Sequence, residues 1–100
     1  MVNYYVYILK SVKNHSYYIG YAKNLGNRLK QHREGLVKAT RYKRPYDLVY
    51  YEVYQNGTEA RQREYQIKKK KSRRYIDYLI ENYRSNGGVA QPVEQLPFKQ

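Results

Sequence analysis

The chain has 100 residues, and its 20 Lys and Arg against eight Asp and Glu give a formal net charge of +12 at pH 7. This length predicts one domain with a small core, and the charge favours a polyanionic partner such as DNA or RNA. The absence of cysteine excludes disulfides and thiolate zinc sites. We expect no membrane span and no signal peptide, and therefore a cytoplasmic protein.

Two strands are predicted near the N-terminus. Residues 4–10, YYVYILK, alternate and branch as a half-buried strand does, and residues 16–21, SYYIGY, predict a second strand that forms a hairpin with the first. Gly20 stands inside the second strand, where a glycine marks a bulge or a close approach by another backbone or by a phosphate. Tyr18 shares a face with Gly20, and we expect Tyr7 of the partner strand to lie close to Tyr18.

A helix is predicted after the hairpin. Asn24 is expected to cap it, and Gly35 is expected to stop it after residue 34. Two leucines give this helix an apolar side, which leaves Arg28 and His32, four residues apart, on another face. Such a pair is most often part of a solvated helix surface. The alternative is that both side chains face a ligand.

The rest of the chain predicts one more strand and two more helices. Residues 37–46 are basic and irregular and are expected to form a loop, and residues 47–54 predict a third strand. After an Asn-Gly turn, Thr58 is expected to cap a helix that runs to about residue 71, and Ser72 a third helix with an apolar stripe. The order β-β-α-β-α-α is typical of the α+β class, here a three-stranded antiparallel sheet flanked by helices.

The last part of the chain has a different character. We expect a domain over residues 1–84 and a disordered tail over residues 85–100, where glycine and proline interrupt any periodicity. The final stretch, GGVAQPVEQLPFKQ, resembles an in-frame translation of a transfer RNA gene. We hypothesise that the reading frame runs into a lysine tRNA gene. Genomic DNA under these codons that cannot fold as a tRNA would contradict this.

One acidic residue of the second predicted helix stands among many basic ones. Glu64 is preceded by Arg61 and Arg63 and followed by a run of lysines. The simpler interpretation is a surface ion pair with Lys68, one turn further along. The alternative is a carboxylate that holds a single divalent metal beside bound phosphates, because Mg²⁺ takes one or two protein carboxylates and completes its shell with water and phosphate. The sequence shows no cluster of acids of the kind that two-metal catalysis needs.

Together these residues resemble the GIY-YIG nuclease superfamily, whose members carry the tripeptide GIY in the first strand and YIG in the second. Here residues 5–7 read YVY, and residues 18–20 are a complete YIG. The resemblance covers about residues 2–83 and is greatest to the short, single-domain bacterial members. One departure is Tyr5, which stands where the first motif has glycine. The tyrosine of that motif is kept.

The resemblance implies a metal-dependent endonuclease that hydrolyses DNA phosphodiester bonds with Mg²⁺ or Mn²⁺. Tyr7 or Tyr18 would activate the attacking water, and the sequence leaves open which of them is the base. Arg28 would stabilise charge on the phosphate, His32 would orient the nucleophile or relay a proton, and Glu64 would bind the metal. A tyrosine base has an ordinary pKa of about 10, and we expect nearby positive charge to lower it.

The surrounding basic residues are expected to contact the DNA backbone, which positions DNA without reading its sequence. Tyr42 or Tyr46 in the loop would stack on an unpaired base. We therefore expect branched, damaged or single-stranded DNA as substrate, in DNA repair, with an accessory protein for targeting. Two alternatives stay open: a basic binding module without catalysis, and a subunit that cuts only with a partner. The expected DNA-binding residues are Lys38, Arg41, Lys43, Arg44, Lys68, Lys69, Lys70, Lys71, Arg73 and Arg74.

Overall fold

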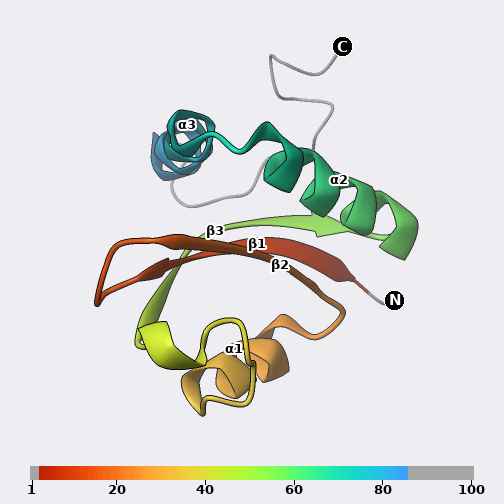
Figure 1. Ribbon diagram of the computed structural model, residues 1–100. Helices are drawn as coiled ribbons and strands as arrows, with labels where there is room; N and C mark the ends of the chain where they lie inside the picture. The colour runs from red at the N-terminus through yellow and green to blue at the C-terminus, as the bar shows by residue number, and fades with distance from the viewer. Residues whose placement is uncertain (1–2, 86–100) are drawn as a thin grey trace.

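The computed structural model describes residues 3–85, and within them it shows one sheet and three α-helices (Figure 1). The predicted order β-β-α-β-α-α is confirmed, with one short 3₁₀ helix added in the loop after the first α-helix. The predicted tail and its tRNA hypothesis lie outside the described residues, apart from Ser85. None of the described helices is long and apolar enough to cross a membrane. The elements are β1 (Tyr4–Ser11), β2 (Tyr17–Ala22), α1 (Leu25–Arg33), η1 (Arg41–Lys43), β3 (Tyr46–Tyr54), α2 (Gly57–Lys70) and α3 (Arg73–Ser85).

Strand β1 is the centre of the sheet, since the strands are ordered β2-β1-β3 and both pairs are antiparallel. Tyr7 of β1 lies opposite Gly20 of β2 and opposite Tyr51 of β3. The pairing of β1 with β3 shifts by one position between Ile8 and Leu9, which marks a β-bulge. The four side chains from Val6 to Leu9 are at most 1% exposed. A strand with such burial is covered on both faces.

Helices cover both faces of the sheet. Figure 1 shows α2 and α3 on one face, and α1 with η1 on the other. Val6 and Ile8 pack in one apolar cluster with Ile67 of α2 and with residues of α3. Tyr7 and Leu9 belong to a second cluster, which includes the two leucines of α1. Alternate residues of β1 therefore serve two separate cores, as the period of two in its sequence predicts.

The helix ends follow their capping residues, with one correction. The side chain of Asn24 accepts a hydrogen bond from the backbone at the start of α1, as predicted. The prediction that Thr58 caps α2 is wrong, because the side chain of Asn56 accepts from the backbone N–H groups of Thr58 and Glu59. Asn56 has extended backbone, so its amide oxygen reaches the first free donors of the helix. Ser72 caps α3 as predicted, because its Oγ accepts a hydrogen bond from the backbone N–H of Tyr75.

A buried ion pair fastens α2 to the sheet. Glu52 of β3 is 0% exposed, and its carboxylate accepts a hydrogen bond from Nε of Arg63 at 3.0 Å. The hydroxyls of Tyr50 and Tyr54 donate to the same carboxylate. Nη1 of Arg63 donates to the hydroxyl of Tyr75 on α3 at 2.9 Å. Arg63 is therefore an internal partner, although its basic surroundings in the sequence suggest a surface cation.

Candidate active site

Tyr7 and Gly20 face each other across the first hairpin at a distance that no larger residue than glycine allows. A Cβ atom built on Gly20 would lie 2.4 Å from Cζ and from Oη of Tyr7. The close approach predicted at Gly20 is therefore present, but the ring of Tyr7 makes it, and not a backbone or a phosphate. Tyr18 lies two residues before Gly20 with its ring centroid 6.4 Å from that of Tyr7, so the structure brings both motif tyrosines together.

His32 of α1 lies against both tyrosines and hydrogen-bonds one of them. Its Nε2 is 2.8 Å from Oη of Tyr7, its Nδ1 is 2.8 Å from Oγ1 of Thr40, and its ring centroid is 5.1 Å from that of Tyr18. The hydroxyl of Thr40 donates to the carbonyl of Val37 at 3.4 Å. The Thr40 oxygen then accepts from Nδ1–H of His32, which leaves Nε2 to accept the proton of Tyr7.

The imidazole of His32 does not present itself on the helix surface. Its side chain is buried, at 2% exposure, so the interpretation of His32 as part of a solvated helix surface is wrong. Its Nε2 instead meets the hydroxyl of Tyr7 inside the protein. Gly20 leaves room for the ring of Tyr7, whose hydroxyl meets the histidine.

Burial keeps both members of the Tyr7–His32 pair uncharged. Removal from water raises the pKa of Tyr7 to about 12, although a hydrogen bond from Arg28 acts in the opposite direction. Removal from water, assisted by the charge of Arg28, lowers the pKa of His32 to about 4. The expected lowering of a tyrosine pKa by nearby charge is therefore wrong for Tyr7. At neutral pH, a phenol donates to a neutral imidazole.

Arg28 supplies positive charge to this group. It lies one helical turn before His32, is partly buried, and its Nη1 donates to Oε1 of Gln31 at 2.9 Å. Its Nε is buried and has no hydrogen-bond partner among the described residues. An unsatisfied buried donor costs free energy, and a guanidinium carries five N–H groups. The donors of Arg28 that remain suit the oxygens of an anion such as phosphate.

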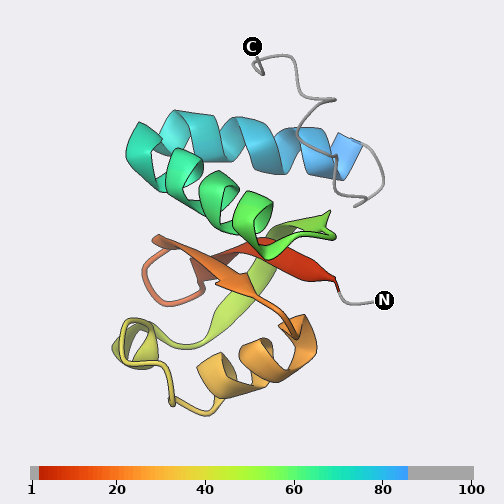
Figure 2. The same cartoon turned by 90° about the vertical axis from the view of Figure 1, so that its right-hand side faces the viewer.

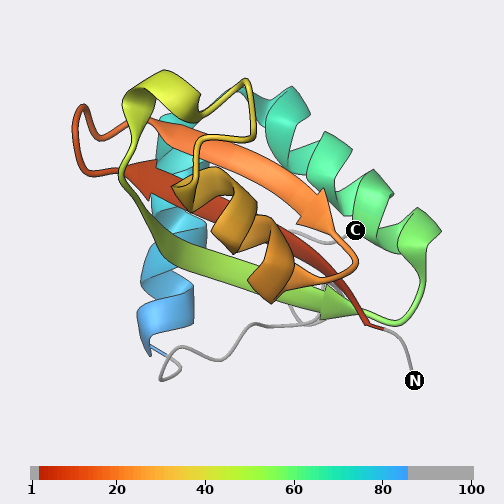
Figure 3. The ribbon, with the colours of Figure 1, turned by 90° about the horizontal axis from the view of Figure 1, so that it is seen from below.

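Glu64 approaches the same group from α2. Figure 3 shows α2 beside β2, with α1 crossing the opposite face of the sheet. The carboxylate charge contributes to the raised pKa of Tyr7, so the two groups are electrostatic neighbours. Its side chain is 21% exposed, and the predicted ion pair with Lys68 is present at 2.8 Å. That lysine is half-exposed, so the pair contributes little free energy and leaves the carboxylate accessible to a stronger cation.

Comparison with known proteins identifies this arrangement. Residues 3–76 match the sequence profile of the GIY-YIG catalytic domain. The chain belongs to the GIY-YIG family. The resemblance inferred from the YIG tripeptide and the residues after it is thereby confirmed, and membership of this nuclease superfamily implies nucleic acid as the class of substrate.

Proteins similar to this chain include UPF0213 proteins. One from Clostridium perfringens is 50% identical over 66 residues, which cover 65% of this chain and 70% of that protein. One from Staphylococcus aureus is 44% identical over 69 residues, 68% of this chain and 83% of that protein. The solution NMR structure of a UPF0213 protein from Bacillus halodurans superimposes with a TM-score of 0.51 at 38% identity, and covers 79% of this chain and 83% of that one.

The GIY-YIG site offers a metal one carboxylate. Within residues 3–85, no three His, Cys, Asp or Glu side chains are grouped as metal ligands. Mg²⁺ is commonly held by one or two carboxylates, with water and substrate phosphate in the other positions. Glu64 is partly exposed, and its charge acts on Tyr7, so it fits such a shared coordination shell.

The ten basic residues predicted to bind DNA are all exposed, but not all are equally available. One group lies in the loop around η1, and the other lies where α2 meets α3. Figure 2 shows both places on the same side of the molecule as the turn between β1 and β2. Arg44 is the least available, since its Nε and Nη1 donate to the carbonyls of Arg41 and Arg33. Arg73 lies 4.5 Å from the ring centroid of Tyr17.

Thr40 is the member of the GIY-YIG site that the sequence does not reveal. It lies in the irregular loop, eight residues after His32, and it is 0% exposed. No periodicity links a loop threonine to a helical histidine, and a single threonine among basic residues is an ordinary loop composition. Its contact depends on how the loop folds back over α1.

Proposed function

We propose that this GIY-YIG chain is a metal-dependent endonuclease that hydrolyses DNA phosphodiester bonds, at sites chosen by DNA structure rather than by sequence. The observation that carries the proposal is the convergence of Tyr7, Tyr18, Arg28 and His32 on one another, with Glu64 as an electrostatic neighbour. A net charge of +12 supports a polyanionic substrate. We place this activity in the cytoplasm and in DNA repair.

The hydrogen-bond chain favours Tyr7 over Tyr18 as the group that activates water. As the attacking water gives its proton to Oη of Tyr7, the phenolic proton passes to Nε2 of His32. Tyr7 thus stays neutral throughout, so its raised pKa does not oppose the step. His32, whose pKa is lowered to about 4, holds the proton only transiently and releases it to solvent. Thr40 holds the other imidazole nitrogen, which fixes the tautomer that accepts the proton.

Arg28 and Glu64 act on the phosphate in this proposal. The oxygen of the activated water bonds to phosphorus, the bond from phosphorus to the leaving oxygen breaks, and that oxygen takes a proton from solvent. Arg28 stabilises the negative charge that builds on the phosphate oxygens. A divalent cation, Mg²⁺ or Mn²⁺, when bound at Glu64 would supply further positive charge to the phosphate.

The content of the described part of the chain supports structure selectivity. Residues 3–85 form the GIY-YIG fold alone, with no second unit to read base edges. The exposed lysines and arginines contact phosphates, and such contacts do not distinguish sequences. The shape of the DNA, or an accessory protein, is then left to select the site of cutting.

A cleavage assay with a matched pair of variants tests the proposal. The pure chain, Glu64→Ala and Glu59→Ala are compared on single-stranded, duplex, flap and junction DNA, with Mg²⁺, Mn²⁺ or EDTA. Glu59 is an exposed acid in the first turn of the same helix. We expect metal-dependent cutting that falls by about 10²–10³ in Glu64→Ala and is kept in Glu59→Ala.

DNA binding by all three proteins with no cutting by any would contradict the proposal and favour a binding module or a partner-dependent subunit. If addition of cell extract then restored cutting, the chain would be a partner-dependent subunit and not a binding module.

A further inference from the structure

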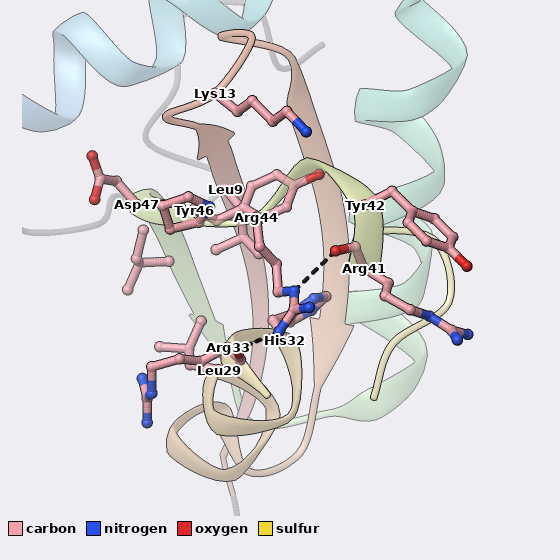
Figure 4. A pocket seen from close by; sticks show the side chains of 12 residues that line it. Leu9, Lys13, Leu29, His32, Arg33, Arg41, Tyr42, Arg44, Tyr46 and Asp47 are labelled. Carbon is pink, nitrogen blue, oxygen red and sulfur yellow. Dashed lines mark hydrogen bonds between the residues drawn. The ribbon is translucent and has the colours of Figure 1, made fainter. Parts of the chain in front are cut away.

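A pocket of about 760 Å³ borders the proposed active site and shares His32 with it, and the mechanism above assigns no role to its other lining residues (Figure 4). It lies between α1, the loop around η1 and the start of β3. Its apolar wall consists of Leu9 of β1, Leu29 of α1 and Leu48 of β3. The volume falls within the range of about 300–1,000 Å³ that is usual for pockets that bind small molecules.

Two side chains connect this pocket with the catalytic group. His32, which accepts from Tyr7, lines the pocket directly. Tyr46 also lines it, and the phenol of Tyr18 contributes, after burial, to a raised pKa of Tyr46. Tyr18 and Tyr46 are therefore electrostatic neighbours, and a molecule in the pocket lies next to any phosphate held by the catalytic residues.

The chemistry of the pocket matches a nucleobase attached to an anionic backbone. Tyr46 and the leucines provide apolar and aromatic surface, while exposed Lys13, Arg33 and Arg41 provide cations at the rim. Figure 4 shows Arg41 and Tyr42 extending away from Arg44, whose guanidinium is tied to two carbonyl groups. Bases stack on aromatic rings without regard to sequence, and cations attract the phosphates on either side.

We propose that this pocket holds one unstacked base of the DNA substrate, from a nucleotide next to the phosphate that is cut. The proposal rests on the proposed function. If the neighbouring catalytic residues bind the phosphate that is cut, a base attached to that DNA strand binds in the pocket in preference to a free nucleotide. Extruding a base from a duplex costs a few kcal/mol, and an unpaired base avoids most of this cost. The pocket therefore gives the enzyme a preference for DNA with unpaired nucleotides.

The test compares two duplexes that carry the same charge. Each has one bulged nucleotide, with a base in the first duplex and an abasic sugar in the second. Affinities are measured by fluorescence anisotropy with Glu64→Gln protein, which keeps the DNA uncut. We expect about 5- to 100-fold tighter binding of the duplex whose bulge carries a base, since stacking on protein aromatics contributes this much per base.

Two variants on β3 locate the effect. Leu48 lines the pocket and is 38% exposed, whereas Val53 lies near the other end of the strand and is 41% exposed. Leu48→Glu is expected to abolish the preference for the base, and Val53→Glu, which makes the same change in charge, is expected to keep it. If thermal melting shows that Leu48→Glu is unfolded, Tyr42→Ala replaces it, with Tyr78→Ala on α3 as its control.

Equal affinity for the two duplexes, or equal loss of the preference in Leu48→Glu and Val53→Glu, would overturn the proposal that the pocket binds a base. This readout does not need cutting. If the chain prefers the base but the unaltered chain never cuts DNA, the base-binding proposal holds and the nuclease proposal fails. If the unaltered chain cuts DNA but shows no base preference, the nuclease proposal holds and the base-binding proposal fails.

Discussion

The two faces of the sheet both carry buried polar networks, but the charges in these networks are balanced differently. On the face covered by α2 and α3, Glu52 and Arg63 neutralise each other. On the face covered by α1, Arg28 has no carboxylate within ion-pair distance among the described residues. Tyrosine hydroxyls take part on both faces, with Tyr50 bound to a carboxylate and Tyr7 bound to an imidazole.

This difference shows why one network is structural and the other suits chemistry. A buried charge that has its counter-charge inside the protein holds two elements together and offers nothing to a ligand. A cation without an internal partner is at its most stable when an anion binds. Residue type alone therefore does not separate the two faces, but the location of the counter-charge does.

The largest expected effect comes from breaking the balanced face. Arg63→Ala leaves the carboxylate of Glu52 buried without its cation, so we expect a loss of about 3–5 kcal/mol in the free energy of unfolding. Urea denaturation measures it. The control is Arg61→Ala on the same helix, an exposed residue 5.9 Å from the ring centroid of Tyr21, for which we expect a loss of about 1 kcal/mol or less. Similar losses in both variants would contradict the role of the ion pair.

On the other face, removing the cation is expected to affect activity and not stability. Arg28→Ala should lower the rate of DNA cleavage by about 10²–10³, because charge on the phosphate loses its partner. The free energy of unfolding should change by less than about 1 kcal/mol, since no internal anion is left unpaired. Lys30→Ala, an exposed cation of the same helix, controls for the loss of charge. If Arg28→Ala lost activity because it unfolded, the proposed contrast between a structural and a functional cation on the two faces would be wrong.

The buried imidazole predicts a pH dependence of stability. The pKa of His32 is about 4 in the folded protein against an ordinary value of 6.5. The unfolded chain therefore binds more protons between these two pH values, so stability is greatest above pH 6.5 and declines as the pH falls toward 4. We expect the decline to reach up to about 3 kcal/mol.

Thermal or urea unfolding across pH 4–7 measures this dependence. His32→Asn should remove it, whereas His15→Asn should keep it, because His15 is exposed and asparagine tolerates its positive φ of 65°. If the free energy of unfolding fell with pH equally in His32→Asn and in the unaltered chain, groups other than His32 would cause the loss of stability in acid.

The smallest expected effects come from two glycines. Gly20→Ala places a Cβ atom 2.4 Å from the ring of Tyr7, so we expect a loss of about 1–3 kcal/mol and a displaced hydroxyl that lowers cleavage. Gly26→Ala in α1 meets no atom closer than 3.8 Å, and should stabilise the protein by about 0.5–1 kcal/mol. Differential scanning calorimetry measures whether each variant is more or less stable than the unaltered chain. A Gly20→Ala variant that is more stable would contradict the close packing of Tyr7 on Gly20.

The sequence predicts those parts of the molecule that depend on local patterns. The strands follow from alternation, the ends of α1 from Asn24 and Gly35, and the layered arrangement from the order of the elements. The positions of Arg28 and His32 follow from helical spacing, and the family resemblance adds Glu64. These features each depend on residues close together in the chain or on a motif.

The features that escape prediction depend on contacts between distant segments. Glu52 stands in an alternating strand, where only the arrival of α2 decides whether its carboxylate meets solvent or Arg63. Thr40 reaches His32 through the fold of an irregular loop. The pKa of Tyr7 is raised by burial that α1 and the sheet create together. Sequence reasoning based on charge alone therefore predicts the wrong direction for this pKa.

The position of β1 at the centre of the sheet, with its partners before and after α1, has a consequence for synthesis on the ribosome. The strands of the first hairpin, α1 and the loop that carries Thr40 leave the ribosome before α2 does. An unfinished chain therefore lacks Glu64, and it also lacks the helices that bury Val6 and Ile8 of β1. The central strand can therefore be covered on both faces, and the whole proposed site completed, only after α2 and α3 have left the ribosome.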